Sequence, residues 1–205
     1  MPTSPSRNAS PSARATLDKV AARTPEGVTL FDNLSLTFGA ERTGVVGRNG
    51  AGKSTLLRLI SGASAPAQGA VSLAGSVGVL DQRHGPAPYK TAAHTLGAAE
   101  GLAIIERVVA GEGSADDLAN ADWTLEVRLH EALSAVGLAD LSLDRPTASL
   151  SGGEQTRLRL AGLMLARPDL ILLDEPTNHL DAEARALVAE VIGRWDGGVV
   201  AVSHD

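Results

Sequence analysis

The sequence predicts an α/β domain in which the strands of a mostly parallel sheet end in polar residues. A glycine-rich octapeptide at residues 47–54 stands between a strand-like segment, 42–46, and a helix-like segment, 55–60. Residues 170–173 form a continuous apolar run, as expected of a central strand that is buried on both faces. With 205 residues, 43% of them hydrophobic and 20% charged, the chain can bury the core of one globular domain.

The octapeptide fits the pattern G-x-x-x-x-G-K-[ST], which is typical of a phosphate-binding loop. Its glycines allow backbone conformations that turn successive N–H groups toward an anion, and the following helix N-terminus favours negative charge. We expect Lys53 to reach the β- and γ-phosphates of a nucleotide and the Ser54 hydroxyl to bind Mg²⁺. The residues expected to contact the nucleotide here are Gly47, Arg48, Asn49, Gly50, Ala51, Gly52, Lys53, Ser54 and Thr55.

The composition excludes several kinds of protein. The chain has no Cys, so disulfides and Cys-ligated metals are excluded, and we expect a cytoplasmic location. No apolar run approaches the ~18–20 residues that cross a membrane. The net charge of −6 argues against a surface that binds nucleic acid by charge alone. Residues 1–16 are rich in Ser, Pro and Ala, lack the apolar segment of a secretory signal, and are expected to form a disordered tail.

Hydrophobic patterning predicts further elements along the chain. Residues 28–38 contain an alternating strand pattern, and residues 71–80 contain two short strands. Residues 91–137 are expected to be helical, with Thr124 as an N-cap and the acidic stretch 111–122 as a surface loop. Later elements are a helix that opens at Ser151 and stops before Pro168, a helix over 182–195 capped by Asp181, and a strand over 199–202.

Four polar residues at strand ends are candidates for phosphoryl-transfer chemistry. Asp174 follows the apolar strand and suits a Mg²⁺ ligand, while Glu175 suits the general base that polarises the attacking water. The alternative for Glu175 is a cap on the following loop. Gln82 is a candidate link between Mg²⁺ and that water, or a plain strand-end residue. His204 is a candidate donor to the γ-phosphate or support for Glu175, although a strand-end His is more often structural.

A second anion-binding element is expected at Ser151-Gly152-Gly153, where a turn leads into a helix N-terminus. One chain holds one triphosphate, which its own phosphate loop already surrounds. This second element therefore suggests a site that is completed by another domain of the same kind.

Together these motifs resemble those of an ATP-binding cassette (ABC) ATPase, and the resemblance covers residues 17–205. Joint occurrence in this order is far more specific than any one motif, because independent chance matches multiply. The segments that resemble the Walker A, Q-loop, signature, Walker B, D-loop and H-loop motifs are residues 47–54, Gln82, residues 150–155, residues 170–175, Leu180-Asp181 and His204.

The resemblance implies a P-loop NTPase fold with an antiparallel β portion and a helical subdomain at about residues 83–149. It implies an ATPase that uses ATP and Mg²⁺ and is active as paired cassettes. Two cassettes of this family sandwich two ATP molecules, so Ser151 and Gly153 are expected to contact the nucleotide that the partner cassette binds.

Residues 174–181 look like the ABC-F branch of the family, which consists of soluble proteins with two fused cassettes. Many of these act on ribosomes during translation, whereas transporter cassettes more often have Ser-Ala where Asn178-His179 stand. The first interpretation is therefore an ABC-F ATPase that acts on the ribosome. The alternatives are the ATP-hydrolysing subunit that energises a membrane-spanning transporter, and a remnant that binds nucleotide without hydrolysing it.

Three departures from the family pattern stand out. The aromatic residue expected to stack on adenine near Arg23-Thr24 is missing, which leaves the preference for ATP over GTP open. The sequence ends at Asp205, before the final strands and helices of a cassette, so we interpret it as the first cassette of a longer protein. The long arm that some ABC-F members insert is not evident in residues 91–137.

Overall fold

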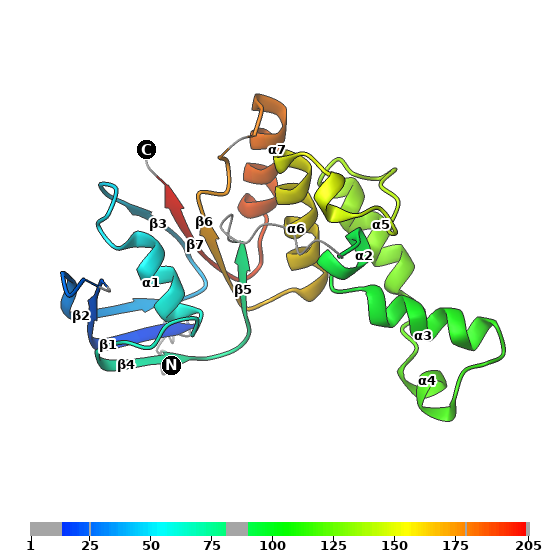
Figure 1. The fold of residues 1–205 in the computed structure, drawn as a ribbon, viewed down its shortest axis with the longest axis horizontal. Helices are drawn as coiled ribbons and strands as arrows, with labels where there is room; N and C mark the ends of the chain where they lie inside the picture. Colours follow the sequence, from blue (N-terminus) through cyan, green and yellow to red (C-terminus); the bar gives the residue numbers. More distant parts are fainter. Residues whose placement is uncertain (1–13, 25, 81–89, 179, 204–205) are drawn as a thin grey trace, which may run out of the picture. The chain divides into compact units, whose positions relative to one another are not determined.

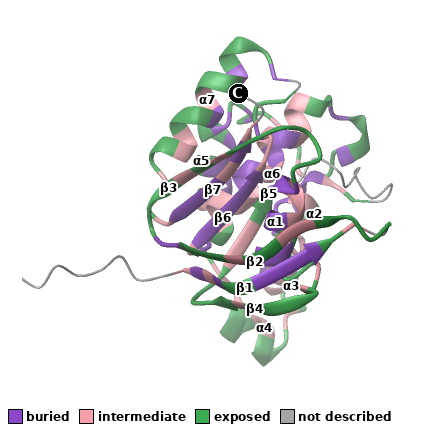
Figure 2. Cartoon of the chain, turned by 90° about the vertical axis from the view of Figure 1, so that its left-hand side faces the viewer, coloured by how far each residue is buried: buried purple, intermediate pink, exposed green. Residues whose placement is uncertain are grey.

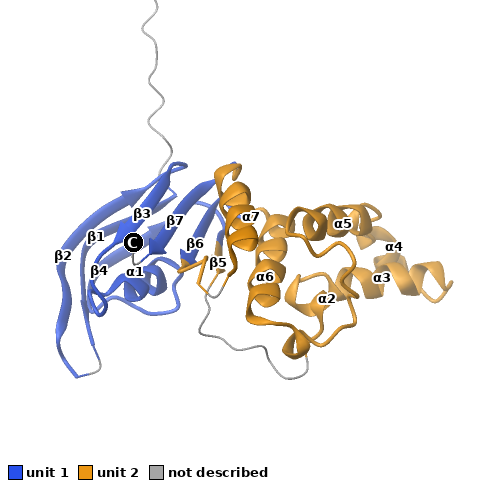
Figure 3. Cartoon of the chain, turned by 90° about the horizontal axis from the view of Figure 1, so that it is seen from above, with its two compact units in different colours: residues 1–77, 168–173, 196–205 blue, residues 78–167, 174–195 orange. Residues whose placement is uncertain are grey.

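The computed structural model describes residues 14–24, 26–80, 90–178 and 180–203. The chain divides into two compact units, which Figure 3 draws in different colours. Unit 1 consists of residues 1–77, 168–173 and 196–205, and unit 2 consists of residues 78–167 and 174–195. Each unit has a hydrophobic core of its own. Of the predicted tail, residues 1–13 lie outside the described part of the chain.

An antiparallel sheet of order β2-β1-β4 forms one part of unit 1 (Figure 1). Its strands are β1 (Ala15–Arg23), β2 (Thr29–Phe38) and β4 (Gln68–Leu73). Leu17 and Val20 of β1 are buried in the core. The strand begins two residues before the boundary expected at residue 17, so Ala15 and Thr16 are not part of a tail.

Bulges in this sheet explain why hydrophobic alternation did not reveal β1. Its register shifts between Asp18 and Ala21 against β4, and between Leu17 and Val20 against β2. Lys19 takes a left-handed φ of 50° at the shift. A hollow of about 360 Å³ lies at the bulges and is lined by Asp18, Lys19, Asp32, Asn33, Gln68, Gly69 and Ala70.

The second sheet has the order β3-β7-β6-β5. Its strands are β3 (Arg42–Val46), β7 (Gly198–Ser203), β6 (Leu170–Asp174) and β5 (Val77–Leu80). β3 and β7 pair in parallel, and the first four residues of β6 are all buried, which confirms the interior strand expected from the apolar run (Figure 2). Burial from both sides is what a continuous apolar strand requires.

Helix α1 (Lys53–Ile60) completes the core of unit 1. Leu56, Leu57, Leu59 and Ile60 are all buried, so one face of this short helix is fixed by packing. The core residues of unit 1 are Ala15, Leu17, Val20, Ala22, Phe38, Leu56, Leu57, Leu59, Ile60, Leu170, Leu172, Val200 and Val202.

Unit 2 is mainly helical, and its core includes Leu129, Leu133, Leu158 and Val188. None of the helices in the described part of the chain is long and apolar enough to span a bilayer. The α-helices are α2 (Ala92–Thr95), α3 (Ala99–Val109), α4 (Ala115–Asn120), α5 (Leu125–Ala135), α6 (Gly152–Ala166) and α7 (Ala182–Gly193).

One local expectation in unit 2 is wrong, and a second is confirmed in position only. Residues 111–122 are not one loop, because Ser114 and Asp117 form a capping box that starts α4. The Arg107 guanidinium and the Ser114 donors hold the pKa of Asp117 below its usual range, and no acidic metal cluster occurs among the described residues. Thr124 occupies the N-cap position of α5, as predicted, but its side chain makes no capping hydrogen bond to the helix. Instead, its N–H and hydroxyl both donate to Asp122 Oδ1, at 3.0 and 2.6 Å.

The expected cap of α7 is confirmed. The Asp181 carboxylate accepts a hydrogen bond of 2.8 Å from the N–H of Ala184, which satisfies one of the donors that the start of a helix leaves without a partner. Leu180, which precedes the cap, is buried in the core of unit 2. The chain that follows β6 is therefore anchored at the start of α7.

Candidate nucleotide-binding site

The glycine-rich loop of unit 1 connects β3 to α1, as the sequence predicts. Gly52 is the N-cap of α1 and has a left-handed backbone, with φ of 90° and ψ of 9°. A Cβ at this position would lie 2.7 Å from Cζ of Phe31, which is far too close. The left-handed backbone therefore favours glycine at this point of the loop, and a Cβ would in addition force the Phe31 ring to shift.

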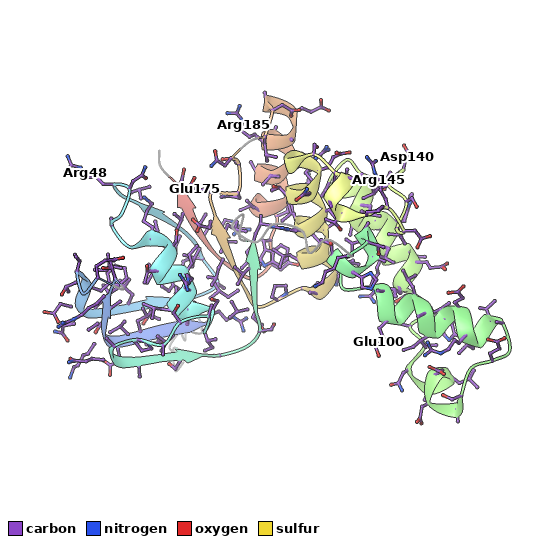
Figure 4. The ribbon with its side chains drawn as sticks, in the orientation of Figure 1. Arg48, Glu100, Asp140, Arg145, Glu175 and Arg185 are labelled. Atoms are coloured by element: carbon purple, nitrogen blue, oxygen red, sulfur yellow. The ribbon has the colours of Figure 1, made fainter. Side chains whose placement is uncertain are left out.

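The side chain of Lys53 lies inside the curve of the loop and binds its backbone. Its side chain is buried, at 9% exposure, and Nζ donates to the carbonyl oxygens of Gly47 and Arg48 at 2.5 and 3.1 Å. The N–H of Ala51 donates to the same Arg48 carbonyl at 3.1 Å. The loop is thus curled around the ammonium group, while the Arg48 side chain is exposed at its tip (Figure 4).

The start of α1 suits an anion. Its first turn contains no acidic side chain, so the partial positive charge of the helix N-terminus is not offset locally. Ser54 and Thr55 in this turn are half-buried, and the next residue, Leu56, is packed into the core. The amides of this turn and the ammonium of Lys53 therefore belong to a rigid part of unit 1.

The predicted acidic pair lies in unit 2, where β6 ends. Asp174 is the last residue of β6, and Glu175 follows it with a left-handed φ of 52° (Figure 4). Both side chains are half-buried. The N–H of Asn178 donates to the Glu175 carbonyl at 3.0 Å, and Asn178 Nδ2 donates to Glu175 Oε2 at 3.0 Å. The residues after the strand thus form a tight turn around Glu175.

The residues predicted to form a second anion-binding element lie at the N-terminus of α6 in unit 2. Ser151 Oγ accepts from the N–H of Glu154 at 3.2 Å, and the N–H of Ser151 donates to Glu154 Oε2 at 2.8 Å. The Ser151 N–H is the main reason that the pKa of Glu154 lies below its usual value. This reciprocal cap was missed in the sequence, although the spacing S-x-x-E signals it.

The structure groups the candidate residues into separate sets. Residues 47–55 lie together in unit 1. Unit 2 holds Asp174 and Glu175 at the end of β6, and residues 151–153 at the start of α6. Gln82 and His204 lie outside the described residues. No aromatic residue stands at positions 23–24, and the aromatic ring against the loop is instead that of Phe31.

A curled glycine loop around a buried lysine, between a strand and a helix N-terminus, defines a P-loop nucleotide-binding domain. A family model described as "ABC transporter" matches residues 31–178. The chain belongs to this family and is an ATP-binding cassette.

Two curated relatives support a more specific placement. The tylosin resistance ATP-binding protein TlrC of Streptomyces fradiae is 36% identical over 222 residues, which cover 96% of this chain and 40% of that protein. The energy-dependent translational throttle protein EttA of Mycobacterium tuberculosis is 36% identical over 199 residues, which cover 86% of this chain and 35% of that protein. The chain therefore spans well under half the length of these relatives. They confirm the resemblance to the ABC-F branch.

Solved structures confirm the cassette fold. The structure of cbiO1 from Clostridium perfringens, part of the ABC transporter complex cbiONQ, matches with a TM-score of 0.66 at 21% identity. The match covers 94% of this chain and 79% of that one. Identity at this level supports a shared fold and no more.

We predict that Gly52→Ala destabilises the chain more than Gly50→Ala. Both glycines have left-handed backbones, with φ of 90° and 80°, so a Cβ at either one costs about 1–2 kcal/mol. A Cβ at position 50 meets no atom within 4 Å, whereas one at position 52 meets Phe31 and adds about 1–3 kcal/mol of overpacking. Urea unfolding followed by circular dichroism measures the difference, and equal losses would contradict the packing role of Gly52.

Proposed function

We propose that this cassette binds Mg²⁺–ATP and hydrolyses the bond between its β- and γ-phosphates, as part of an ABC-F protein that acts in translation. The observation that carries the proposal is the loop in unit 1, curled around the buried ammonium of Lys53. Such a loop presents both backbone N–H donors and a fixed positive charge to a triphosphate.

The chain's own groups bind and orient the nucleotide. The amides of residues 47–55 bind the phosphate oxygens, and Lys53 neutralises charge on the β- and γ-phosphates. Because Lys53 is held by two carbonyl oxygens, its ammonium is oriented before the ligand arrives. Such preorganisation favours electrostatic stabilisation of the transition state, since little reorganisation remains to be done.

The candidate metal ligands fit Mg²⁺ by their chemistry. Ser54 provides a hydroxyl and Asp174 a carboxylate, and Mg²⁺ prefers hard oxygen ligands of these kinds. Gln82 is proposed as a further ligand through its amide oxygen. Held by these residues, Mg²⁺ would supply positive charge that offsets the phosphate charge repelling a nucleophile.

Glu175 is proposed as the general base. It takes a proton from the attacking water while that water bonds to the γ-phosphorus and the bond to the bridging oxygen of ADP breaks. His204 is proposed to donate to the γ-phosphate or to support Glu175. The tight turn after β6 supports the role of Glu175 as the base, because the turn fixes the Glu175 backbone.

A second cassette is proposed to complete the site with its own α6 N-terminus. The capping box of α6 uses the N–H groups of Ser151 and Glu154, whereas those of Gly152 and Gly153 are not part of it. These N–H groups and the Ser151 hydroxyl suit a phosphate held by the opposing cassette. A site shared in this way couples nucleotide binding to the closing of two cassettes.

The ribosome is the proposed target of that closing motion. The relative EttA is named a translational throttle protein, and residues 174–181 follow the ABC-F pattern. For the alternative, the energising subunit of a transporter, the matching transporter structures are only 20–23% identical and bear on the fold alone. Sequence similarity therefore favours the ribosome over a membrane-spanning partner.

Lys53→Ala is expected to lower ATP affinity by roughly 100-fold or more. Removing one member of a close charge pair costs about 2–5 kcal/mol, and no other described cation is held inside the loop. Arg58→Ala, an exposed position on the same helix, is the matched control and is expected to bind ATP as the wild type does. Isothermal titration calorimetry measures both, and wild-type affinity in Lys53→Ala would contradict the proposed loop chemistry.

A Glu175→Gln variant is expected to co-sediment with ribosomes when ATP is present. The amide cannot accept the proton from water, so the nucleotide stays intact and the closed state accumulates. The same variant without ATP, and the double variant Glu175→Gln/Lys53→Ala with ATP, serve as controls and are expected to stay in the soluble fraction. Absence of the Glu175→Gln variant from the ribosomal fraction with ATP would count against the proposed target.

A further inference from the structure

The backbone at Glu175 is in a conformation that a non-glycine residue rarely adopts. Its φ of 52° lies in the left-handed region, and the residue directly follows the last position of β6. Such a conformation persists only where the surrounding structure holds it in place, and it is enriched at functional sites. The contacts that fix Glu175 are therefore of interest beyond the side chain itself.

Asn178 makes two separate hydrogen bonds to Glu175. Its backbone N–H donates to the Glu175 carbonyl at 3.0 Å and closes the four-residue turn. Its side-chain Nδ2 donates to Glu175 Oε2, also at 3.0 Å. The first bond holds the backbone and the second holds the carboxylate, so the two functions can be separated by substitution.

From this geometry we infer that Asn178 is a positioning residue for the general base, an inference that rests on the proposed function of Glu175. The bond to Oε2 restricts rotation of the carboxylate about its last carbon–carbon bond. It thereby sets which oxygen lone pairs face the attacking water. Correct orientation of a base matters because proton transfer requires a hydrogen-bonded approach of about 2.6–3.2 Å.

The chemical identity of the Asn178 side chain suits this role. A carboxamide donates a hydrogen bond without a full positive charge, so it orients the carboxylate and leaves the anion less stabilised than an ion pair would. A hydrogen-bond donor is needed, since a carboxylate at position 178 would repel Glu175 and an alanine would leave Oε2 without this contact. The polar turn after β6 thus gives Glu175 an orientation that the strand alone does not provide.

Substitution of Asn178 separates positioning from turn formation. Asn178→Ala keeps the backbone N–H and therefore the turn, but it removes the side-chain bond to Oε2. We expect single-turnover ATP hydrolysis by the full chain to slow by about tenfold, with ATP affinity within twofold of wild type, because the change affects the base and not the phosphate loop. Asn178→Asp is expected to slow hydrolysis further. Thr177→Ala, an exposed neighbour in the same turn, is the matched control and should hydrolyse ATP at the wild-type rate.

A double-mutant cycle tests whether Asn178 acts through Glu175. In a Glu175→Gln background, Asn178→Ala should not reduce the residual rate further, because the base is already lost. An equal fractional loss in both backgrounds, or a rate for Asn178→Ala within twofold of wild type, would overturn the inference. If Glu175→Gln itself hydrolyses ATP at the wild-type rate, the proposed function of Glu175 fails instead, and the two failures are distinguishable.

A crystal structure of Asn178→Ala provides a readout that does not depend on activity. The inference predicts that the Glu175 backbone keeps its left-handed φ while the carboxylate rotates away from its wild-type orientation. A carboxylate that keeps the wild-type orientation without the Asn178 amide would show that other contacts position it, and would overturn the inference.

Discussion

At Gly52 the chain leaves the loop and enters α1 with a φ of 90°, and the groups proposed to hold phosphate depend on that turn. A side chain at this position would meet the ring of Phe31 on the antiparallel sheet, so the ring would have to shift to admit it. The turn brings Lys53 inside the loop, where two carbonyl oxygens hold its ammonium. Packing of α1 in the core of unit 1 then keeps this arrangement rigid.

At the end of β6, packing and hydrogen bonds likewise hold the chain around a residue with a proposed function. Four buried residues fix the strand, and the chain then reverses direction through the turn that Asn178 closes onto Glu175. The Asp181 cap anchors the far end of this segment at the start of α7. The proposed base thus lies in the segment between a buried strand and a capped helix, and its carboxylate accepts a hydrogen bond from Asn178.

The sequence was most informative where local chemistry and periodicity agree. The loop between β3 and α1, the apolar strand β6 and the Asp181 cap each follow from short-range rules about glycine, burial and helix termini. Bulges interrupt the alternation in β1, and the acidic composition around Ser114 obscured the capping box that begins α4. The contact of Phe31 with Gly52 joins distant segments, and the bond from Asn178 depends on a left-handed φ that no propensity at Glu175 predicts. These features follow from tertiary structure, which a pattern in one sequence does not determine.

The central claim is that the loop around Lys53 is a preformed cradle for a magnesium-bound triphosphate. A crystal structure of the chain with Mg²⁺ and a non-hydrolysable ATP analogue tests it most directly. The account predicts the β- and γ-phosphates within hydrogen-bond distance of the loop amides and of Lys53 Nζ, with Gly52 still left-handed. A triphosphate bound elsewhere, or a loop that must refold around Gly52 to admit it, would contradict the account.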